Sequence, residues 1–170
     1  CPPRPPYLRN GHVMTIAASL RRTTRPCSFF RRLLTTPDGG TLALDFLVAC
    51  AQRSDVVGAA ADAAATAQSP AAATSYDERC QASTVFTDAP PPLRPSKPFL
   101  LLVSGLGGGS QDTYVRSMAA AAAERGWQVA CLNMRACGDS PVMSPRFFSA
   151  HRGSTCDVRH AIATLRREGR

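Results

Sequence analysis

The sequence predicts an α/β fold that opens with an antiparallel hairpin and continues as a parallel strand-helix-strand-helix unit. Two observations support this prediction. Near the beginning, two extended runs flank a Pro-Asp-Gly turn, and after residue 98 two apolar runs of strand length alternate with segments of helical periodicity. The 170 residues, of which 44% are hydrophobic, suffice for one domain with a core or for a piece of a larger one.

The hairpin is expected at residues 29–35, "FFRRLLT", and 41–48, "TLALDFLV", which the residues "TPDGG" connect. Glycine accepts the positive φ that tight turns demand, so Asp-Gly after a proline is a strong turn signal. Together with the arginine-rich residues before it, the hairpin forms a first unit at 1–48.

Residues 49–97 differ in composition, being rich in Ala, Ser, Thr, Gln and Pro. Alanine favours a short helix around residues 59–67 but brings little apolar surface to bury, and the prolines at 90–92 and 95 prevent regular structure after it. We therefore predict a long, largely disordered insertion in the connection between two strands.

The third unit, residues 98–170, has a regular pattern. The runs "PFLLLV" (98–103) and "WQVACLNM" (127–134) are typical of parallel strands that are covered on both faces. Apolar residues recur at helical spacing in 111–125 and 154–167. Strand, helix, strand and helix in this order predict a parallel sheet with right-handed crossovers.

The two predicted helices have their own local signals. The first should have Ser110 or Asp112 near its N-cap and Gly126 at its C-terminal end. The expected apolar faces are Tyr114, Val115, Met118, Ala119 and Ala122 in the first helix, and Val158, Ile162 and Leu165 in the second.

The segment "SGLGGGS" (104–110) connects the first parallel strand to its helix. Ligands of open parallel sheets bind outside the carboxyl ends of strands, and the amides and dipole of a helix N-terminus attract an anion. The anion could be a phosphate or a transition-state oxyanion. A Walker loop is excluded, because no lysine precedes Ser110.

A dinucleotide-binding loop remains an alternative. Gly105 and Gly107 match the G-x-G-x-x-G fingerprint, but Ser110 occupies its third position. The acidic residue expected after the next strand is Asn133, although Arg135 nearby could accept a 2′-phosphate. The opening hairpin argues against this fold, since a dinucleotide-binding domain normally begins with the fingerprint strand.

The oxyanion interpretation accounts for more of the chain. In α/β hydrolases, an antiparallel start precedes a strand whose terminal loop donates a backbone N–H to the tetrahedral intermediate. Here "SGLGG" occupies that place. The next strand ends in "NMRACGDS", which resembles the hydrolase D-x-R-G-x-G-x-S turn at Asn133, Arg135, Gly138 and Ser140, with Ala136 replacing a glycine.

Several motifs occur together in order: "YLRNGHVMTI", "TPDGGTLALDF", "SGLGGGSQDTYVRSM", "RGWQVACLNMRACGDSP" and "SPRFFSA" followed by an aspartate. Over residues 7–48 and 98–165 the chain therefore resembles the YheT-like branch of the AB hydrolase superfamily. That branch includes plant embryogenesis-associated hydrolases and animal abhydrolase-domain lipases.

The resemblance implies a partial α/β-hydrolase fold and a serine hydrolase that acts on carboxylic esters, with lipid or short-chain acyl groups as substrates and no cofactor. Some eukaryotic members are membrane-anchored, so peripheral association or an upstream anchor is possible here. The backbone N–H of Leu106 is the expected oxyanion donor, and Gly105 and Gly107 allow the turn. The nucleophile strand would normally cover a central edge of the sheet, so this chain is expected to leave that edge open.

The chain contains no G-x-S-x-G serine elbow, which the resemblance places after its last helix. The triad order of serine, acid and histidine puts His12, His151 and His160 too early to be the base. Asp157 also precedes the nucleophile position, so it is not the triad acid. We therefore expect nucleophile, acid and base to lie outside this chain and the chain alone to be inactive.

Three further residues have expected supporting roles. The ring of Tyr114, the tyrosine of the family's Y-V-R motif, should pack under the glycine loop. Arg135 and Asp139 should tie the turn after the second parallel strand together through a salt bridge or backbone hydrogen bonds. Ala136, where the family has glycine, should loosen that turn.

The basic charge is unevenly distributed. The net charge is +8, the cations are nineteen arginines and one lysine, and no acidic residue precedes Asp38. The cationic arm of about thirty residues could meet phosphate on a lipid headgroup or nucleic acid, so a non-catalytic basic module is a further alternative. Nucleic acid is not expected, because no aromatic residues interleave with the arginines.

Seven cysteines in irregular spacing argue against a disulfide framework and indicate a reducing compartment. The residues Cys137, His151, Cys156 and His160 match no common ligand spacing, so no metal is expected. No apolar stretch is long enough to span a bilayer. The chain is therefore expected in the cytoplasm or at a membrane surface that faces it.

Overall fold

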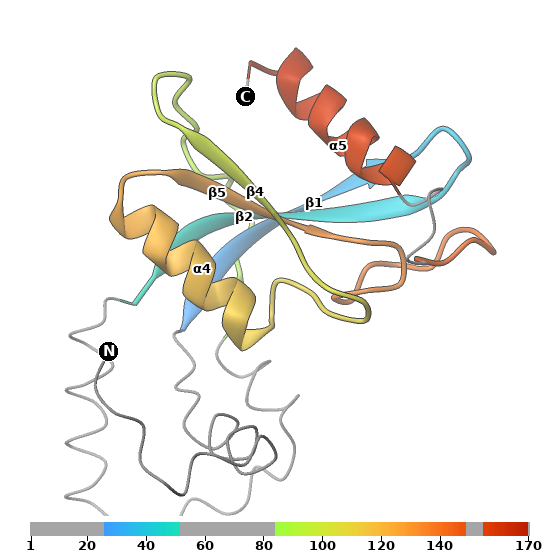
Figure 1. The fold of residues 1–170 in the computed structure, drawn as a ribbon, viewed down its shortest axis with the longest axis horizontal. Coiled ribbons are helices and arrows are strands. Elements are labelled where there is room, and N and C mark those ends of the chain that lie inside the picture. Colours follow the sequence, from blue (N-terminus) through green and yellow to red (C-terminus); the bar gives the residue numbers. More distant parts are fainter. Residues whose placement is uncertain (1–25, 52–83, 149–154, 170) are drawn as a thin grey trace, which may run out of the picture.

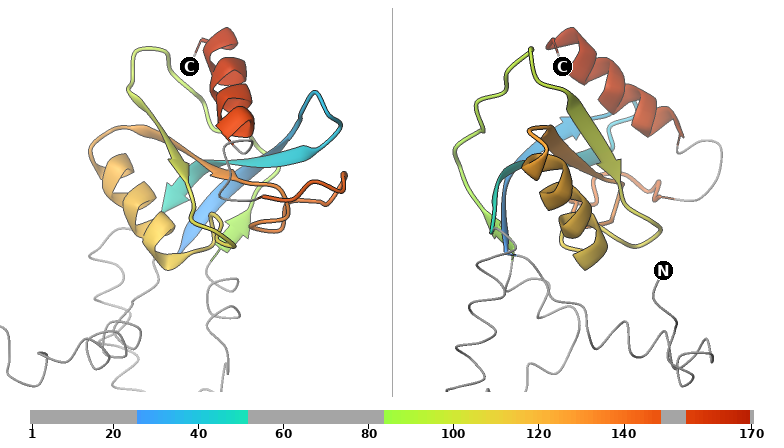
Figure 2. Two further views of the ribbon diagram at one scale, coloured as in Figure 1. Left: turned by 45° about the vertical axis from the view of Figure 1, so that its right-hand side comes forward. Right: turned by 60° about the vertical axis from the view of Figure 1, so that its left-hand side comes forward.

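The computed structural model describes residues 26–51, 84–148 and 155–169, which form a mixed five-stranded sheet with one helix on each face (Figures 1 and 2). The strands are β1 (Cys27–Thr35), β2 (Thr41–Cys50), β3 (Thr84–Phe86), β4 (Phe99–Val103) and β5 (Gln128–Asn133), and the helices are α4 (Thr113–Glu124) and α5 (Thr155–Arg167). The spatial order is β3-β1-β2-β5-β4. This arrangement agrees with the predicted α/β class.

The opening hairpin is confirmed. Strands β1 and β2 pair antiparallel from Thr35 opposite Thr41 to Cys27 opposite Cys50, so both strands are slightly longer than predicted. The connecting turn has Gly39 at φ +78°, which is the left-handed conformation that the Asp-Gly signal indicates.

The connection after β2 contains a strand that the sequence analysis did not predict. Residues Thr84–Phe86 form β3, which pairs parallel with the outer edge of β1. The composition of 49–97 does not indicate this strand. Its three residues are extended because they pair with the edge of β1, which is distant in the sequence. Residues 87–98 form no helix or strand, as the prolines indicated. The predicted helix at 59–67 lies outside the described residues.

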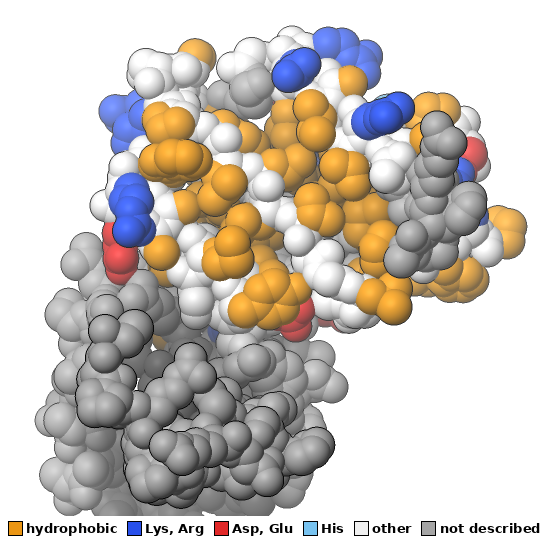
Figure 3. All heavy atoms as spheres, viewed as in Figure 1, with side chains coloured by type: hydrophobic (Ala, Val, Ile, Leu, Met, Phe, Trp, Pro, Cys, Tyr) orange, Lys and Arg blue, Asp and Glu red, His pale blue; other side chains and the backbone are white. Residues whose placement is uncertain are grey.

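Strands β4 and β5 pair parallel as predicted, and β5 lies at the centre of the sheet, antiparallel to β2. Five of its six residues are buried. Strand β4 is an edge strand in the described part of the chain, and Val103 is 44% exposed. The expectation that both strands are covered on both faces is therefore wrong for β4. Figure 3 shows hydrophobic side chains gathered on the side of the molecule that faces the viewer in Figure 1.

The two helices cover opposite faces of the sheet, because alternate residues of β5 point to opposite sides. Val129 and Cys131 belong to the cluster that packs against α4. Ala130 and Leu132 belong to the larger cluster that packs against α5. Both helices occur where the sequence periodicity predicts them, and Gly126 ends α4 at φ +80°.

The predicted apolar faces of the helices are only partly correct. The buried residues are Thr113, Val115, Arg116, Ala119 and Ala120 in α4, and Asp157, Ala161 and Leu165 in α5. Tyr114 and Met118 are 43% and 54% exposed, and Ile162 is 38% exposed. Each helix buries a charged residue, Arg116 in α4 and Asp157 in α5. The prediction of the apolar faces considered only apolar residues and therefore missed both.

The cysteine prediction is wrong at one point. A disulfide joins Cys27 to Cys50, which the antiparallel register places opposite each other at the open end of the hairpin. Pairing across 23 residues is invisible in the linear spacing, and the argument for a reducing compartment loses its basis. Cys131, Cys137 and Cys156 are free, and no group of described residues is placed to hold a metal ion.

Arg135 connects three parts of the fold. Its guanidinium, 4% exposed, donates two hydrogen bonds of 2.8 Å to Asp157 on α5 and two of 2.7 and 2.9 Å to Asp38 in the hairpin turn. A Cβ at Gly40 would lie 2.7 Å from its Cζ, so glycine leaves room for the arginine. The predicted partner, Asp139, is not bonded to Arg135, since two carboxylates from distant segments already occupy the guanidinium.

The hydrogen bonds between Arg135 and Asp38 shift the pKa of both side chains. Hydrogen bonds from Arg135 hold the pKa of Asp38 well below its usual range. The hydrogen bonds to Asp157, and then those to Asp38, raise the pKa of Arg135. The ion pair between Arg135 and Asp38 therefore persists across the whole ordinary pH range.

The lowered pKa of Asp38 predicts an acid-sensitive contribution to stability. As the pH falls below about 4, the unfolded chain takes up a proton at this position before the folded protein does, so the free energy of unfolding falls. In urea unfolding between pH 5 and pH 2.5, the parent should lose stability more steeply than the Asp38→Asn variant. Asp88→Asn, which changes an exposed aspartate, should follow the parent; parallel profiles for parent and Asp38→Asn would contradict the prediction.

No helix of the described residues is long and apolar enough to cross a membrane.

Candidate functional site

Two loops meet at the carboxyl ends of the parallel strands β4 and β5 (Figure 1). Loop 104–112 leads into α4, and loop 134–140 follows β5. Their backbones touch: a Cβ on Gly109 would lie 2.5 Å from the Cα of Gly138, and one on Gly138 would lie 3.0 Å from the Cα of Gly109. Only glycine at both positions permits this approach, so the loops form one unit.

The tip of the first loop is a tight turn. The N–H of Gly108 donates to the carbonyl of Gly105 at 3.1 Å, and Gly107 has φ +73°, which is the pattern of a type II turn. The hydroxyl of Ser104 donates to the carbonyl of Gly108 at 2.8 Å and closes the base of the turn. The turn therefore has a defined shape despite its four glycines.

Four of the six amides from 105 to 110 already have acceptors. Gly105 N–H donates to the Tyr114 hydroxyl at 2.8 Å and Gly108 N–H to the turn. Two more amides are held by side chains: Gly109 N–H by Asp112 at 3.2 Å and Ser110 N–H by Asn133 at 2.8 Å.

The remaining amides, those of Leu106 and Gly107, have no hydrogen-bond partner within the described parts of the chain. The Leu106 side chain is 74% exposed, so the tip of the turn faces outward. Leu106 is the donor that the sequence analysis named. The amide of Gly107 is a second available donor, whereas the sequence suggested only that this glycine permits the turn.

A buried carboxylate holds the loops in place. Asp45 of β2 is fully buried and accepts two hydrogen bonds of 2.7 Å from Arg31 of β1. It also accepts bonds of 2.5 Å from the Ser110 hydroxyl and from the Asn133 amide. The sequence analysis missed this network, although an aspartate within the apolar run "TLALDFLV" is a detectable signal, since a buried charge needs partners.

Arg31 extends this network to the second loop. Its guanidinium donates to the carbonyl of Gly138 at 2.8 Å and to that of Asp139 at 3.2 Å. Arg31 therefore links Asp45 to the second loop through hydrogen bonds. The sequence analysis had counted it with the cationic arm. Residues 1–25 of that arm lie outside the described residues.

Loop 134–140 consists of two successive turns. Cys137 N–H donates to the carbonyl of Met134, and Ser140 N–H to that of Cys137, both at 3.0 Å. Ala136 has φ +56° in the first turn, and Gly138 and Asp139 have φ +55° and +57° in the second. The turn at Ala136 is closed and not loosened as predicted; the alanine instead adopts a conformation that favours glycine.

The other residues that the sequence analysis discussed lie away from the glycine loop or outside the described residues. Asp157 is buried against Arg135 and takes no part in the loop unit. His160 contacts the carbonyl of Thr35 at 3.2 Å, away from the glycine loop, and His12 and His151 lie outside the described residues. Burial raises the pKa of the Cys131 thiol, so this cysteine is no candidate nucleophile.

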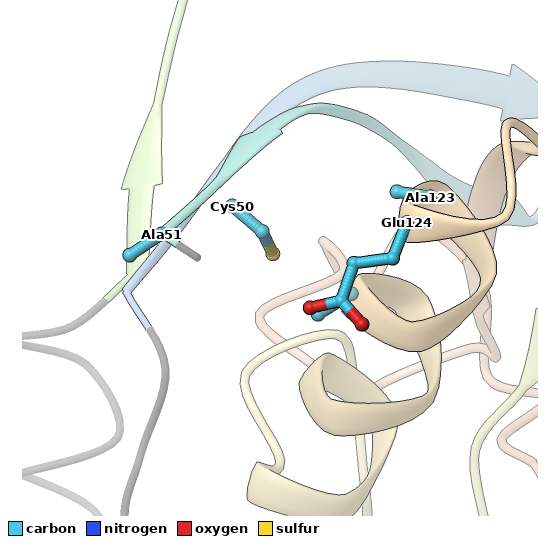
Figure 4. Close-up of a pocket in the computed structure, with 5 residues that line it drawn as sticks. Cys50, Ala51, Ala123 and Glu124 are labelled. Carbon is cyan, nitrogen blue, oxygen red and sulfur yellow. The ribbon is translucent and has the colours of Figure 1, made fainter. Parts of the chain in front are cut away.

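A separate hollow of about 170 Å³ lies between the end of β2 and the last turn of α4 (Figure 4). Cys50, Ala51, Ala120, Ala123 and Glu124 line it. It is smaller than the roughly 300–1,000 Å³ of ligand pockets and lies at the opposite end of α4 from the glycine loop. The loop unit therefore remains the candidate site.

The chain is similar to the embryogenesis-associated protein EMB8 of Picea glauca, with 32% identity over 145 residues. The match covers 85% of this chain and 24% of the relative, so the chain spans about a quarter of that protein's length. No family model and no solved structure matches the chain. The similarity agrees with the plant proteins of the predicted branch, and membership of the hydrolase superfamily stays a prediction.

The contact between the two loops predicts that alanine substitutions at Gly109 and Gly105 have different effects on stability. Gly109→Ala should lower the free energy of unfolding by about 1–3 kcal/mol, because the new methyl group overlaps the backbone of Gly138. Gly105→Ala is the matched control: its Cβ would meet only the Tyr114 hydroxyl at 3.6 Å, an ordinary contact. Urea unfolding compares the two variants, and equal stability losses would show that the loops are not in close contact.

The positive φ of Ala136 predicts a stabilising substitution. Ala136→Gly should raise the free energy of unfolding by about 1 kcal/mol, because the left-handed conformation costs alanine roughly that amount. Ala163→Gly, an exposed position within α5, should have the opposite effect of similar size. Thermal and urea unfolding measure both changes; a loss of stability in Ala136→Gly would refute the assigned conformation.

Proposed function

We propose that this chain forms the N-terminal part of a serine hydrolase of the α/β-hydrolase fold, which cleaves carboxylic esters. In this proposal the turn at 105–108 is its oxyanion loop. The single observation that carries the proposal is that Leu106 and Gly107 are exposed at the carboxyl end of β4 and that their amides have no hydrogen-bond partner among the described residues.

The chemistry requires such donors. Attack of a serine on an ester places negative charge on the former carbonyl oxygen, and preorganised N–H groups stabilise that charge most effectively. One such donor contributes about 3–4 kcal/mol to the lowering of the barrier. The chain's own part in catalysis is to hold these donors still, while the nucleophile, acid and base come from polypeptide beyond it, since no G-x-S-x-G occurs here.

The sheet supports this assignment. The opening hairpin belongs to the same sheet as the parallel pair, with β5 between β2 and β4, as an antiparallel start to a hydrolase sheet requires. The outer edge of β4 carries no strand in the described residues and is available to the strand that would lead to the nucleophile.

The surroundings favour an apolar acyl group in the substrate. Four hydrophobic side chains that follow β4 and β5 are more than half exposed: Leu106, Val142, Met143 and Phe147. We therefore propose lipid or short-chain acyl esters as substrates, without a cofactor.

The loop geometry argues against the dinucleotide alternative. A pyrophosphate would need the first amides before α4, but those of Gly109 and Ser110 already bind side chains. One of the acceptors is the carboxylate of Asp112, which would repel a phosphate. The basic-module alternative depends on residues 1–25, outside the described parts, and predicts salt-dependent retention on anionic vesicles.

The proposal predicts a reactive serine in the longer protein that contains this chain. A fluorophosphonate probe should label one serine within a G-x-S-x-G sequence, and p-nitrophenyl butyrate should be hydrolysed. The separate 170-residue chain should show neither reaction. NADPH binding measured by fluorescence tests the alternative; ester hydrolysis by the short chain, or an unlabelled longer protein, would overturn the proposal.

A further inference from the structure

We propose that Tyr114 is a positioning residue, whose hydroxyl oxygen fixes the turn that presents the Leu106 and Gly107 amides. This inference rests on the proposed function. It concerns a side chain with no part in the bond-making chemistry, and it assigns to the tyrosine a role beyond packing under the loop.

The hydroxyl of Tyr114 accepts the N–H of Gly105 at 2.8 Å. Tyr114 is the second residue of α4, so this bond ties the start of the turn to a helix that packs firmly on the sheet through Val115 and Ala119. The ring is 43% exposed. An aromatic residue that served the core would be buried, so this side chain does more than contribute apolar area.

Different side chains hold the first half of the loop, residues 105–107, and its second half, residues 108–110. The second half is attached to the rest of the fold at Ser110, whose N–H donates to Asn133 and whose hydroxyl donates to Asp45. The bonds from Ser104, Gly108 and Gly109 join parts of the loop to each other and do not attach it to the rest of the fold.

Among the described residues, the hydrogen bond from Gly105 to Tyr114 attaches the first half of the loop to the rest of the fold. Without it, the peptide groups at 105–107 would pivot about the glycines, and the two outward amides would lose their fixed direction. Because oxyanion stabilisation depends on donors that need no reorganisation, the cost would appear in the chemical step and not in substrate binding.

In the hydrogen bond between Gly105 and Tyr114, the backbone N–H is the donor and the phenol oxygen is the acceptor. Because the phenol oxygen is the acceptor, its own proton remains available to another group. Tyr114 could therefore act on the turn as an acceptor or on the substrate as a donor. The two roles respond in opposite ways when the acidity of the phenol is raised, so they can be separated by experiment.

The test uses the longer protein and compares Tyr114→Phe with the parent. We expect kcat for p-nitrophenyl butyrate to fall about tenfold with KM unchanged within about twofold, since only transition-state binding is lost. The rate of fluorophosphonate labelling should fall by a similar factor, and hydrogen exchange of the peptide covering 104–110 should accelerate. Met118→Leu, one turn further along the same exposed face of α4, is the control that should retain the parent kcat.

A 3-fluorotyrosine at position 114 separates the two roles, because fluorine weakens the phenol as an acceptor and strengthens it as a donor. Our proposal expects kcat to fall, whereas a rise in kcat would assign Tyr114 to the substrate and overturn it. Parental kcat and exchange in Tyr114→Phe would overturn the positioning role alone. A parent protein that neither reacts with the probe nor hydrolyses the ester would overturn the proposed function and this inference together.

Discussion

The structure of the candidate site depends on one buried charge, the carboxylate of Asp45. A carboxylate without exposure to water is tolerated only when it is paired and fully hydrogen-bonded. Its partners Arg31, Ser110 and Asn133 come from three different segments: the hairpin, the glycine loop and the end of β5. Satisfying this single group therefore fixes the relative positions of all three, and removing any partner would leave part of a charge uncompensated.

The hairpin has a second role in this architecture. Arg135, two residues after Asn133, binds Asp38 in the hairpin turn and Asp157 on α5. The motif "TPDGG" and the Asn-x-Arg sequence, almost one hundred residues apart, thus form one contact. Gly40 belongs to it as well, since the guanidinium occupies the space that a side chain would need. In this chain the two motifs therefore form a single interface.

The glycines of the candidate site serve different purposes. Gly107 supplies the positive φ of the turn, and Gly109 allows the backbone of the next loop to approach. The abundance of glycine thus produces a compact loop with a defined shape, which the hydroxyl of Tyr114 ties to α4. A rigid turn with two outward amides is the arrangement that stabilisation of an oxyanion requires, because flexible donors would have to be reorganised during the reaction.

The sequence by itself determined the hairpin, both parallel strands and both helices, because a turn dipeptide, apolar runs and periodic spacing are local signals. It also indicated the glycine loop and Leu106 as a candidate donor. Only the tertiary structure decided the Cys27–Cys50 disulfide, the short strand β3 and the inward direction of Asp157, since each depends on a partner distant in the chain. The same holds for Asp45 and Arg31: local patterns assign charged residues to the surface, and the fold buries Asp45 because it brings Arg31 and the other partners to it.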